Sequence, residues 1–255
     1  MTIAHAILLF AAAVVAGVLN SVAGGGTFFT FPALLFTGVP PIHANATSTV
    51  AVWPGSVASA RAYRKRLPKS PQLLVPLIAA SLAGGLVGAE LLLHTPPHIF
   101  LHLIPFLLFA ATLLFTLSTK ISRWAYAEEG HARPSWISLG GVTLLQFLTA
   151  TYGGYFGAGM GILMLSFLAL LPLGDIHTMN SVKTVLTSMA NGVALVTFIA
   201  ARIILWPQGI LMLSGAVLGG YGGAHYAQKL NPRHVRAFVV ATGFTMSAIF
   251  FLKYK

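Results

Sequence analysis

The chain has 255 residues, of which 56% are hydrophobic and only 7% charged, and its mean hydropathy is +0.83. Soluble domains carry about 25% charged residues, so this composition excludes a water-soluble globule and indicates a protein whose solvent is the lipid bilayer. The 15 Lys and Arg against 4 Asp and Glu are typical of basic loops facing anionic lipid, which we favour over nucleic-acid binding. The absence of Cys excludes disulfides and zinc–thiolate sites.

Apolar segments follow one another along the chain on both sides of a hydrophilic linker at residues 119–135. They fall at residues 3–20, 27–38, 43–60, 72–93, 98–118, 136–155, 160–172, 180–205, 208–228 and 236–252. The first lacks a preceding basic stretch, so we expect a retained span and not a signal peptide. A span needs about 20 helical residues, so segments 27–38 and 160–172 are predicted to be half-helices. The sequence thus predicts an all-α polytopic integral membrane protein of about eight to ten transmembrane or half-membrane helices.

The two halves of the chain match at one offset of 135 residues, the difference between positions 24 and 159. The aligned pairs are Gly24 with Gly159, Gly26 with Gly161, Asn45 with Asn180, Thr49 with Thr184, Gly84 with Gly219, Gly85 with Gly220, Gly88 with Gly223 and Pro97 with Pro232. A single offset for Gly, Asn and Pro matches is typical of a duplication. We therefore predict a first membrane repeat at residues 1–118 and a second at residues 136–255.

The relative direction of the repeats is a separate question. Residues 61–69 form the densest basic loop, which we predict to be cytoplasmic. Even and odd numbers of crossings in each half distribute the remaining basic residues equally well, so charge alone does not choose between them. We favour the odd, inverted arrangement, because inverted repeats with broken helices are a common carrier design.

Two glycine-rich breaks lie at equivalent places in the repeats, at residues 20–27 and 152–161. Consecutive glycines do not favour a helix, and irregular backbone at membrane depth persists only where it is buried in protein or lines a wet cavity. Its free N–H groups, and the N-terminus of the half-helix that follows, suit an anion. The alternative is that the glycines only permit close helix crossing. We predict that the breaks meet near the midplane and bind substrate there.

Polar residues begin the long segment that follows each short one, at residues 43–49 and 180–184. Helix capping explains part of this pattern, but Thr187 and Asn191 continue the polar face into the helix interior. Lys183 is the one Lys or Arg placed inside an apolar segment and away from its ends. A charge there is costly and indicates function by default, the alternative being a side chain that snorkels from a helix end.

Acidic residues are too few to indicate a catalytic centre. Glu90 precedes His94 by four residues, and this pair is the one candidate for a membrane-embedded enzyme; proton coupling through Glu90, His43 or His177 is a further alternative. We find no cluster of metal ligands, nucleotide-binding loop or Gly-x-Ser-x-Gly motif. We therefore predict a transporter without cofactor, metal or catalytic residue. A lack of buried carboxylates disfavours a cation carrier, and a scaffold has no need of polar residues inside its helices.

These motifs resemble the sulfite exporter TauE/SafE family over nearly the whole chain. In the first half they are Asn20 to Pro32 with glycines at 24–26, then Gly38, Pro40 and Asn-Ala-Thr-Ser at 45–48. In the second half they are Gly-Ala-Gly-Met-Gly at 157–161, then Asn180 to Lys183 and Asn191. Two departures change the shape of the second break: Met160 interrupts the glycine triplet, and Phe167 stands at the counterpart of Pro32.

The resemblance implies a permease of the cytoplasmic membrane that moves sulfite, organosulfonates or related small organic anions, usually as an exporter. The substrate-binding positions that it implies are Gly24, Gly25, Gly26, Asn45, Thr47, Ser48, Gly157, Gly159, Gly161, Lys183 and Asn191. The polar helix face adds Thr184 to this set. We expect alternating access around a small anionic substrate, with one repeat rocking or gating against the other. The sequence leaves the anion, the direction, the coupling ion and homo-oligomer formation open.

Overall fold

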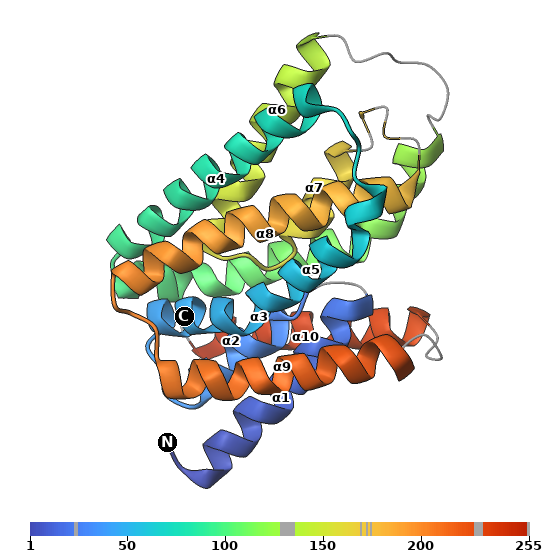
Figure 1. Cartoon of the computed structure of the whole chain (residues 1–255). Coiled ribbons are helices and arrows are strands. Elements are labelled where there is room, and N and C mark those ends of the chain that lie inside the picture. The colour runs from blue at the N-terminus through green and yellow to red at the C-terminus, as the bar shows by residue number, and fades with distance from the viewer. Residues whose placement is uncertain are drawn as a thin grey trace.

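The computed structural model describes residues 1–22, 25–127, 136–168, 170–171, 173, 175–226 and 232–253. These residues form ten α-helices and one 3-10 turn, and no strand (Figure 1). The elements are α1 (Ile3–Val22), α2 (Thr27–Phe36), α3 (Pro41–Tyr63), η1 (Arg64–Arg66), α4 (Pro71–His94), α5 (Pro97–Ala127), α6 (Trp136–Tyr155), α7 (Met160–Leu168), α8 (Ile176–Ala200), α9 (Trp206–Tyr226) and α10 (Pro232–Lys253). The predicted all-α polytopic fold is confirmed.

Helix length and composition agree with a bilayer as the solvent. Within the described residues, four stretches are long and apolar enough to cross a membrane, namely Ile3–Asn20, Pro71–His94, Pro97–Leu117 and His177–Ala200. In contrast, α2 has 10 residues and α7 has 9, about half of what a span needs. The two glycine breaks are therefore each followed by a short helix, as predicted.

Local chemistry explains where several helices begin. Four of them, α3, α4, α5 and α10, start at a proline, whose fixed φ suits the first helical position and whose missing N–H is not needed there. Asp175 caps α8 instead: its Oδ1 accepts hydrogen bonds from the backbone N–H of His177 at 2.7 Å and of Thr178 at 3.0 Å. The Thr178 hydroxyl donates to Asp175 Oδ2 at 2.9 Å.

The Asp175 cap should contribute to stability in a pH-dependent way. The pKa of the Asp175 carboxyl lies below its usual range. The largest causes are the hydrogen bonds from the backbone and hydroxyl of Thr178, and the bond from His177 and the nearby charge of Arg66 add to them. A lowered pKa stabilises the fold fully above the pKa of an unfolded aspartate, and this stabilisation is lost as pH falls through the lowered value. We expect Asp175→Ala to unfold at a lower temperature in detergent than wild type, with a gap that narrows on acidification. Asp175→Asn keeps an acceptor and is the control; a gap that is unchanged in acid would contradict the role of the carboxylate.

Glycines bring α4 and α6 into backbone contact. A Cβ on Gly84 would meet the carbonyl oxygen of Phe147, and a Cβ on Gly88 would overlap that of Thr151. The contacts advance in the same direction along both helices, so α4 and α6 run parallel. Small residues permit this approach, which matters because lipid provides no hydrophobic drive between helices.

The α1–α9 pair is built in the same way. A Cβ on Gly215 would meet the carbonyl oxygen of Phe10, and a Cβ on Gly219 would overlap that of Val14. These helices are therefore also parallel. In Figure 1, α4 and α6 lie at the top of the molecule and α1 and α9 at the bottom, with α3 and α8 between them.

The central pair, α3 and α8, runs antiparallel. Trp53 Nε1 donates to the backbone oxygen of Ser188 at 3.0 Å, and η1, which follows α3, packs against α8. The proximity of Arg66 to Asp175 places η1 at the start of α8. The C-terminal end of α3 and the N-terminal end of α8 thus lie at the same end of the bundle, on the right in Figure 1.

Helix directions relate the two halves of the chain. Short connections join α3 to α4 and α8 to α9, so each of these pairs reverses direction. Because α3 and α8 are antiparallel, α4 with its parallel partner α6 runs opposite to α9 with its parallel partner α1. Hence α1 and α6, which correspond at the 135-residue offset, point in opposite directions. This order supports our proposal of two inverted repeats at residues 1–118 and 136–255.

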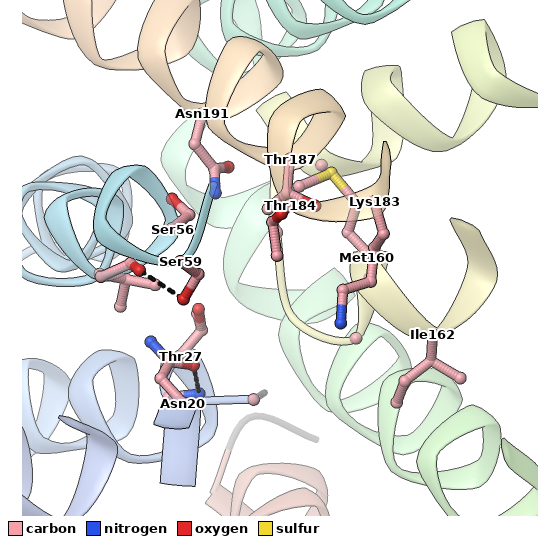
Figure 2. Close-up of a pocket in the computed structure, with 18 of the residues that line it drawn as sticks. Asn20, Thr27, Ser56, Ser59, Met160, Ile162, Lys183, Thr184, Thr187 and Asn191 are labelled. Atoms are coloured by element: carbon pink, nitrogen blue, oxygen red, sulfur yellow. Dashed lines mark hydrogen bonds between the residues drawn. The ribbon is translucent and has the colours of Figure 1, made fainter. Parts of the chain in front are cut away.

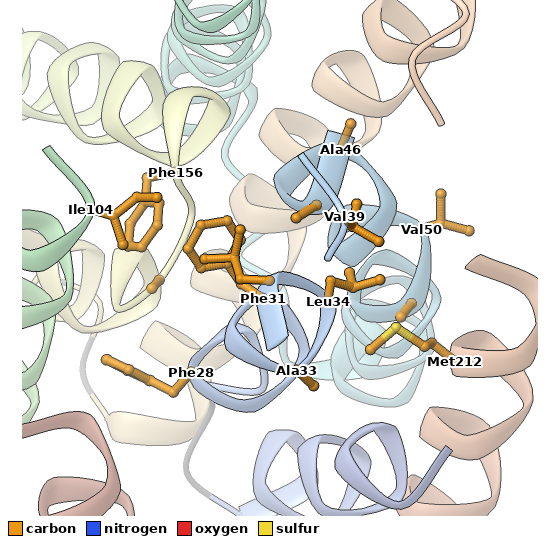
Figure 3. Close-up of a cluster of buried hydrophobic side chains, with 14 of the residues drawn as sticks. Phe28, Phe31, Ala33, Leu34, Val39, Ala46, Val50, Ile104, Phe156 and Met212 are labelled. Carbon is orange, nitrogen blue, oxygen red and sulfur yellow. The ribbon is translucent and has the colours of Figure 1, made fainter. Parts of the chain in front are cut away.

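Buried hydrophobic side chains fill the bundle beside the start of α3, and Figure 3 shows Phe31 and Phe156 among them. Phe31 packs edge-on against Phe156, with ring centroids 5.4 Å apart, and against Phe100 at 6.3 Å. Phe100 in turn packs against Tyr155 at 5.6 Å. Phe31 and Phe100 are fully buried and Phe156 nearly so. We call these four residues the aromatic cluster; it joins α2, α5 and the end of α6.

Candidate functional site

A cavity of about 380 Å³ lies between the two glycine breaks and is closed at its sides by α3 and α8 (Figure 2). Its polar lining residues are Asn20, Thr27, Thr49, Ser56, Ser59, Tyr63, Asn180, Lys183, Thr184, Thr187 and Asn191. The other lining residues are Gly25, Gly26, Val52, Gly55, Gly153, Phe156, Gly157, Gly159, Met160, Gly161, Ile162 and Leu165. Its volume falls within the range of small-molecule binding pockets, about 300–1,000 Å³.

The side chain of Asn20 stabilises the backbone of the first break at Gly26. Asn20 Oδ1 accepts a hydrogen bond from the Gly26 N–H at 2.9 Å, which satisfies a backbone donor that the interrupted helix leaves free. Gly25 has φ +96°, a conformation that residues with a Cβ rarely adopt. The first turn of α2, from Gly26 and Thr27, therefore lines the cavity and presents the positive end of a short helix to it.

The second break uses two left-handed glycines. Gly157 has φ +84° and Gly159 has φ +77°. The Tyr152 hydroxyl donates to the carbonyl oxygen of Ala158 at 2.6 Å and so fixes the loop between them. Met160 and Gly161 begin α7 and line the cavity from the side opposite α2. Met160 interrupts the glycine triplet, yet both halves of the chain present a half-helix N-terminus to the same space.

Lys183 reaches the cavity across the start of α7. A Cβ on Gly161 would lie 3.4 Å from Lys183 Cδ, so the glycine leaves room for the lysine stem. Lys183 Nζ donates to Asn180 Oδ1 at 2.8 Å, one turn back on α8. Thr187 and Asn191 continue the same face of α8, and in Figure 2 the Asn191 amide points toward α3. The polar face predicted for this helix therefore lines the cavity.

The wall contributed by α3 was not among the predicted site residues. Thr49, Ser56, Ser59 and Tyr63 line the cavity at helical spacing. The hydroxyls of Thr49, Ser56 and Ser59 each donate to a backbone oxygen of their own helix. The sequence carried a signal for this wall, because polar residues at positions 49, 56, 59 and 63 fall on one helical face, but they lie toward the end of an apolar segment where polar residues are common.

Three predicted residues at the start of α3 lie elsewhere. Asn45 Nδ2 donates to the Tyr155 backbone oxygen at 3.0 Å, and Thr47 Oγ1 accepts from the Leu205 N–H at 3.1 Å. The hydroxyls of Ser48 and Thr30 are hydrogen-bonded at 2.6 Å. All three side chains are buried, and none of them lines the cavity. They connect α3 to its neighbours. Gly24 lies outside the described residues.

The remaining alternatives from the sequence find no place in this cavity. Glu90 and His94 do meet, with 3.7 Å between Glu90 Oε2 and His94 Nδ1, but the two side chains are 49% and 80% exposed and neither lines the cavity. The part of the chain that the structure describes contains no group of three or more His, Cys, Asp or Glu that could hold a metal ion.

The cavity offers hydrogen-bond donors to a ligand. Its described lining contains no Asp or Glu, and no carboxylate of the described residues pairs with Lys183. An ammonium group has three N–H donors and no acceptor, so two donors of Lys183 remain after its bond to Asn180. Asn20 Oδ1 is occupied by Gly26, and the Asn20 amide N–H₂ has no hydrogen-bond partner among the described residues. A donor-rich space without acceptor charge favours an anion over a cation.

Comparison with known proteins gives one consistent result. The sequence model of the family described as "Sulfite exporter TauE/SafE" matches residues 9–250. A probable membrane transporter protein, ORF9, of Sinorhizobium sp is 30% identical over 240 residues, which cover 94% of this chain and 89% of the relative. A probable membrane transporter protein of Haemophilus influenzae is 31% identical over 243 residues, 94% of this chain and 92% of the relative. The probable membrane transporter protein YfcA of Escherichia coli is 28% identical over 244 residues, 94% and 87% respectively. No solved structure matches significantly.

Proposed function

Because the chain belongs to the sulfite exporter TauE/SafE family, and is thus a multi-pass transporter of the cell membrane and not an enzyme, we propose that it carries small anions such as sulfite, organosulfonates or related organic anions. The observation that carries this proposal is the cavity between the two glycine breaks, where Lys183 has no acidic partner among the described residues and both half-helix N-termini line the wall. The bilayer and the anion are its two partners.

We assign substrate binding to those predicted residues that line the cavity. Gly25, Gly159 and Gly161 supply backbone amides. The N–H groups of Gly26 and Gly157 are bonded to Asn20 and Tyr152, so these two glycines only leave room for close approach. Side chains are supplied by Lys183, Thr184 and Asn191. An anion leaving water exchanges its hydration shell for these donors, and half-helix dipoles add partial positive charge. We propose that Asn45, Thr47 and Ser48 act differently from the way the sequence indicated, by fixing α3 against Tyr155, Leu205 and Thr30.

Alternating access then follows from the packing of the two halves. Phe156 lines the cavity, and its ring packs on Phe31 of the other half. Trp53 of α3 donates to Ser188 of α8 and ties the halves together beside the cavity. Moving one half against the other separates the aromatic contact at one end and closes the walls of α3 and α8 at the other. The bound anion is thereby exposed to each side of the membrane in turn.

Flux measurement tests the proposal directly. Purified protein in proteoliposomes should take up radiolabelled sulfite or a short-chain organosulfonate with saturable kinetics, and excess unlabelled anion should compete. Sodium or a small organic cation, offered in the same vesicles, should show no flux above that of protein-free vesicles. Saturable uptake of a cation without any anion flux would overturn the proposal and favour a cation carrier.

A further inference from the structure

The lining of the cavity follows α3 to its C-terminal end. Thr49, Ser56, Ser59 and Tyr63 line it in succession, and 14 residues at 1.5 Å each carry this wall over about 20 Å. Tyr63 is the last residue of α3 and is partly exposed. Phe156 also lines the cavity, but it is only 2% exposed and packs on Phe31, so it gives no opening to solvent. The mouth of the cavity therefore lies where α3 ends.

The surface around this mouth is strongly basic. Arg61, Arg64, Lys65, Arg66 and Lys69 are all exposed and flank Tyr63 in sequence. From the other wall, the start of α8 brings one carboxylate, Asp175, close to Arg66. That carboxylate also accepts the three hydrogen bonds of the α8 cap. Among the described residues, five cations against one acid leave a net positive charge at the mouth.

We propose that the exposed cations of Arg61, Arg64, Lys65 and Arg66 form an access vestibule that draws anions from the cytoplasmic side into the cavity, with Lys183 as the second cation on the path. The assignment rests on the proposed anion transport. The cytoplasmic location follows from the basic loop, since Lys and Arg gather in cytoplasmic loops. The structure is accordingly open to the cytoplasm and sealed by the aromatic cluster toward the other side.

The physical basis is electrostatic focusing. A cleft lined by one sign of charge between low-dielectric walls raises the local concentration of counter-ions and their on-rates by 10- to 10³-fold. About 10 residues of helix, or 15 Å, separate a vestibule cation at the end of α3 from the middle of the cavity, somewhat more than the Debye length of about 10 Å at 0.1 M salt. The vestibule should therefore act on the anion before Lys183 does, and its effect should vanish at high salt.

The absence of native Cys allows a test that needs no transport. Ser59→Cys places the single thiol of the chain in the vestibule wall, and His98→Cys places it on the exposed start of α5, at the other end of the bundle. Each purified variant, in detergent, is treated with an anionic reagent, sulfonatoethyl methanethiosulfonate, and with a cationic one, trimethylammonioethyl methanethiosulfonate. The ratio of the two rates at His98→Cys corrects for the intrinsic reactivity of the reagents.

The expected result is a corrected rate ratio that favours the anionic reagent by about tenfold at low salt and approaches unity near 1 M salt, where the Debye length is about 3 Å. Adding Arg64→Gln, Lys65→Gln and Arg66→Gln should lower the ratio at low salt. Ser56→Cys, one turn deeper, repeats the measurement if Ser59→Cys is not recovered folded. The vestibule would be overturned if the ratio of anionic to cationic rates at Ser59→Cys equalled that at His98→Cys. It would also be overturned if neither reagent reached the thiol in the vestibule wall.

Sidedness is tested in intact cells with the same impermeant reagents added outside. His98→Cys should react and Ser59→Cys should not; the reverse pattern would overturn the cytoplasmic assignment. The labelling result is independent of flux. If the labelling is charge-selective but no anion flux is found, the proposed transport is overturned and the basic vestibule remains as an electrostatic feature. If anion flux is found but the labelling is not charge-selective, the carrier remains and the vestibule is overturned.

Discussion

Replacing Lys183 by methionine is expected to reduce anion flux by about 100-fold or more while leaving the protein folded. Lys183 is the one side-chain cation in the described lining of the cavity, and its stem lies against Gly161 of the second break. Removing one partner of a buried charge–charge contact costs about 3–5 kcal/mol, which corresponds to about two to four orders of magnitude in affinity. Initial uptake rates over a range of anion concentrations in proteoliposomes measure the effect.

Two further measurements separate this role from a structural one. A lysine without an acid partner in the bilayer is costly to bury, so Lys183→Met should unfold at the same or a higher temperature than wild type. Lys183→Arg keeps the charge but changes its shape and hydrogen-bonding geometry, and it should retain part of the flux with a raised KM. Wild-type flux in Lys183→Met would remove Lys183 from the site, while a lower unfolding temperature would indicate that its bond to Asn180 is structural.

Gly88→Ala is expected to prevent correct packing of the helix pair α4–α6, although it adds only one methyl group. A Cβ on Gly88 would overlap the Thr151 carbonyl oxygen and would lie 2.8 Å from the Tyr155 backbone nitrogen. Backbone atoms cannot rotate away as a side chain would, so α4 and α6 must separate along their length. We expect a loss of about 3 kcal/mol or more, at the upper end of overpacking effects. Thermal unfolding in detergent and size-exclusion profiles measure it.

The same substitution at another glycine of this helix pair is the control. Gly140 lies on α6, and a Cβ there would meet nothing within 4 Å. Gly140→Ala should therefore unfold at or slightly above the wild-type temperature, because alanine favours the helix by up to about 1 kcal/mol. Equal unfolding temperatures for the two variants would show that α4 and α6 approach less closely than the structure has them.

Much of the fold followed from hydropathy alone. The predicted segment 72–93 became α4 (Pro71–His94), and segment 136–155 became α6 with the same bounds. Lipid forces every backbone group in a span to pair within its own helix, so a long apolar run has few alternatives to a helix. Prolines and glycines then mark the ends and breaks, since one lacks an N–H and the other adopts left-handed φ. These are local constraints, and local sequence expresses them.

Which face of α3 meets the cavity was decided only by tertiary packing. The sequence offers polar residues on several faces of this helix, and those at its start, Asn45 and Ser48, were as suitable as Ser56 and Ser59 farther along. Trp53 fixes the rotation of α3 by its bond to Ser188, 135 positions away, and Asn45 bonds to Tyr155. Helix rotation depends on such distant partners, which no local pattern encodes.

The relative direction of the two repeats likewise depends on tertiary packing and not on the sequence alone. The sequence determined that there are two glycine breaks at one offset, that Lys183 lies within an apolar helix, and that the bilayer is the solvent. It left even and odd crossings balanced, because both place the same number of basic residues on each side of the membrane, although not the same residues. Antiparallel packing of α3 on α8 supports the inverted arrangement that we propose, and both half-helix N-termini line one cavity. Charge and hydropathy act residue by residue, whereas relative direction and shared space arise only when helices from the two halves pack together.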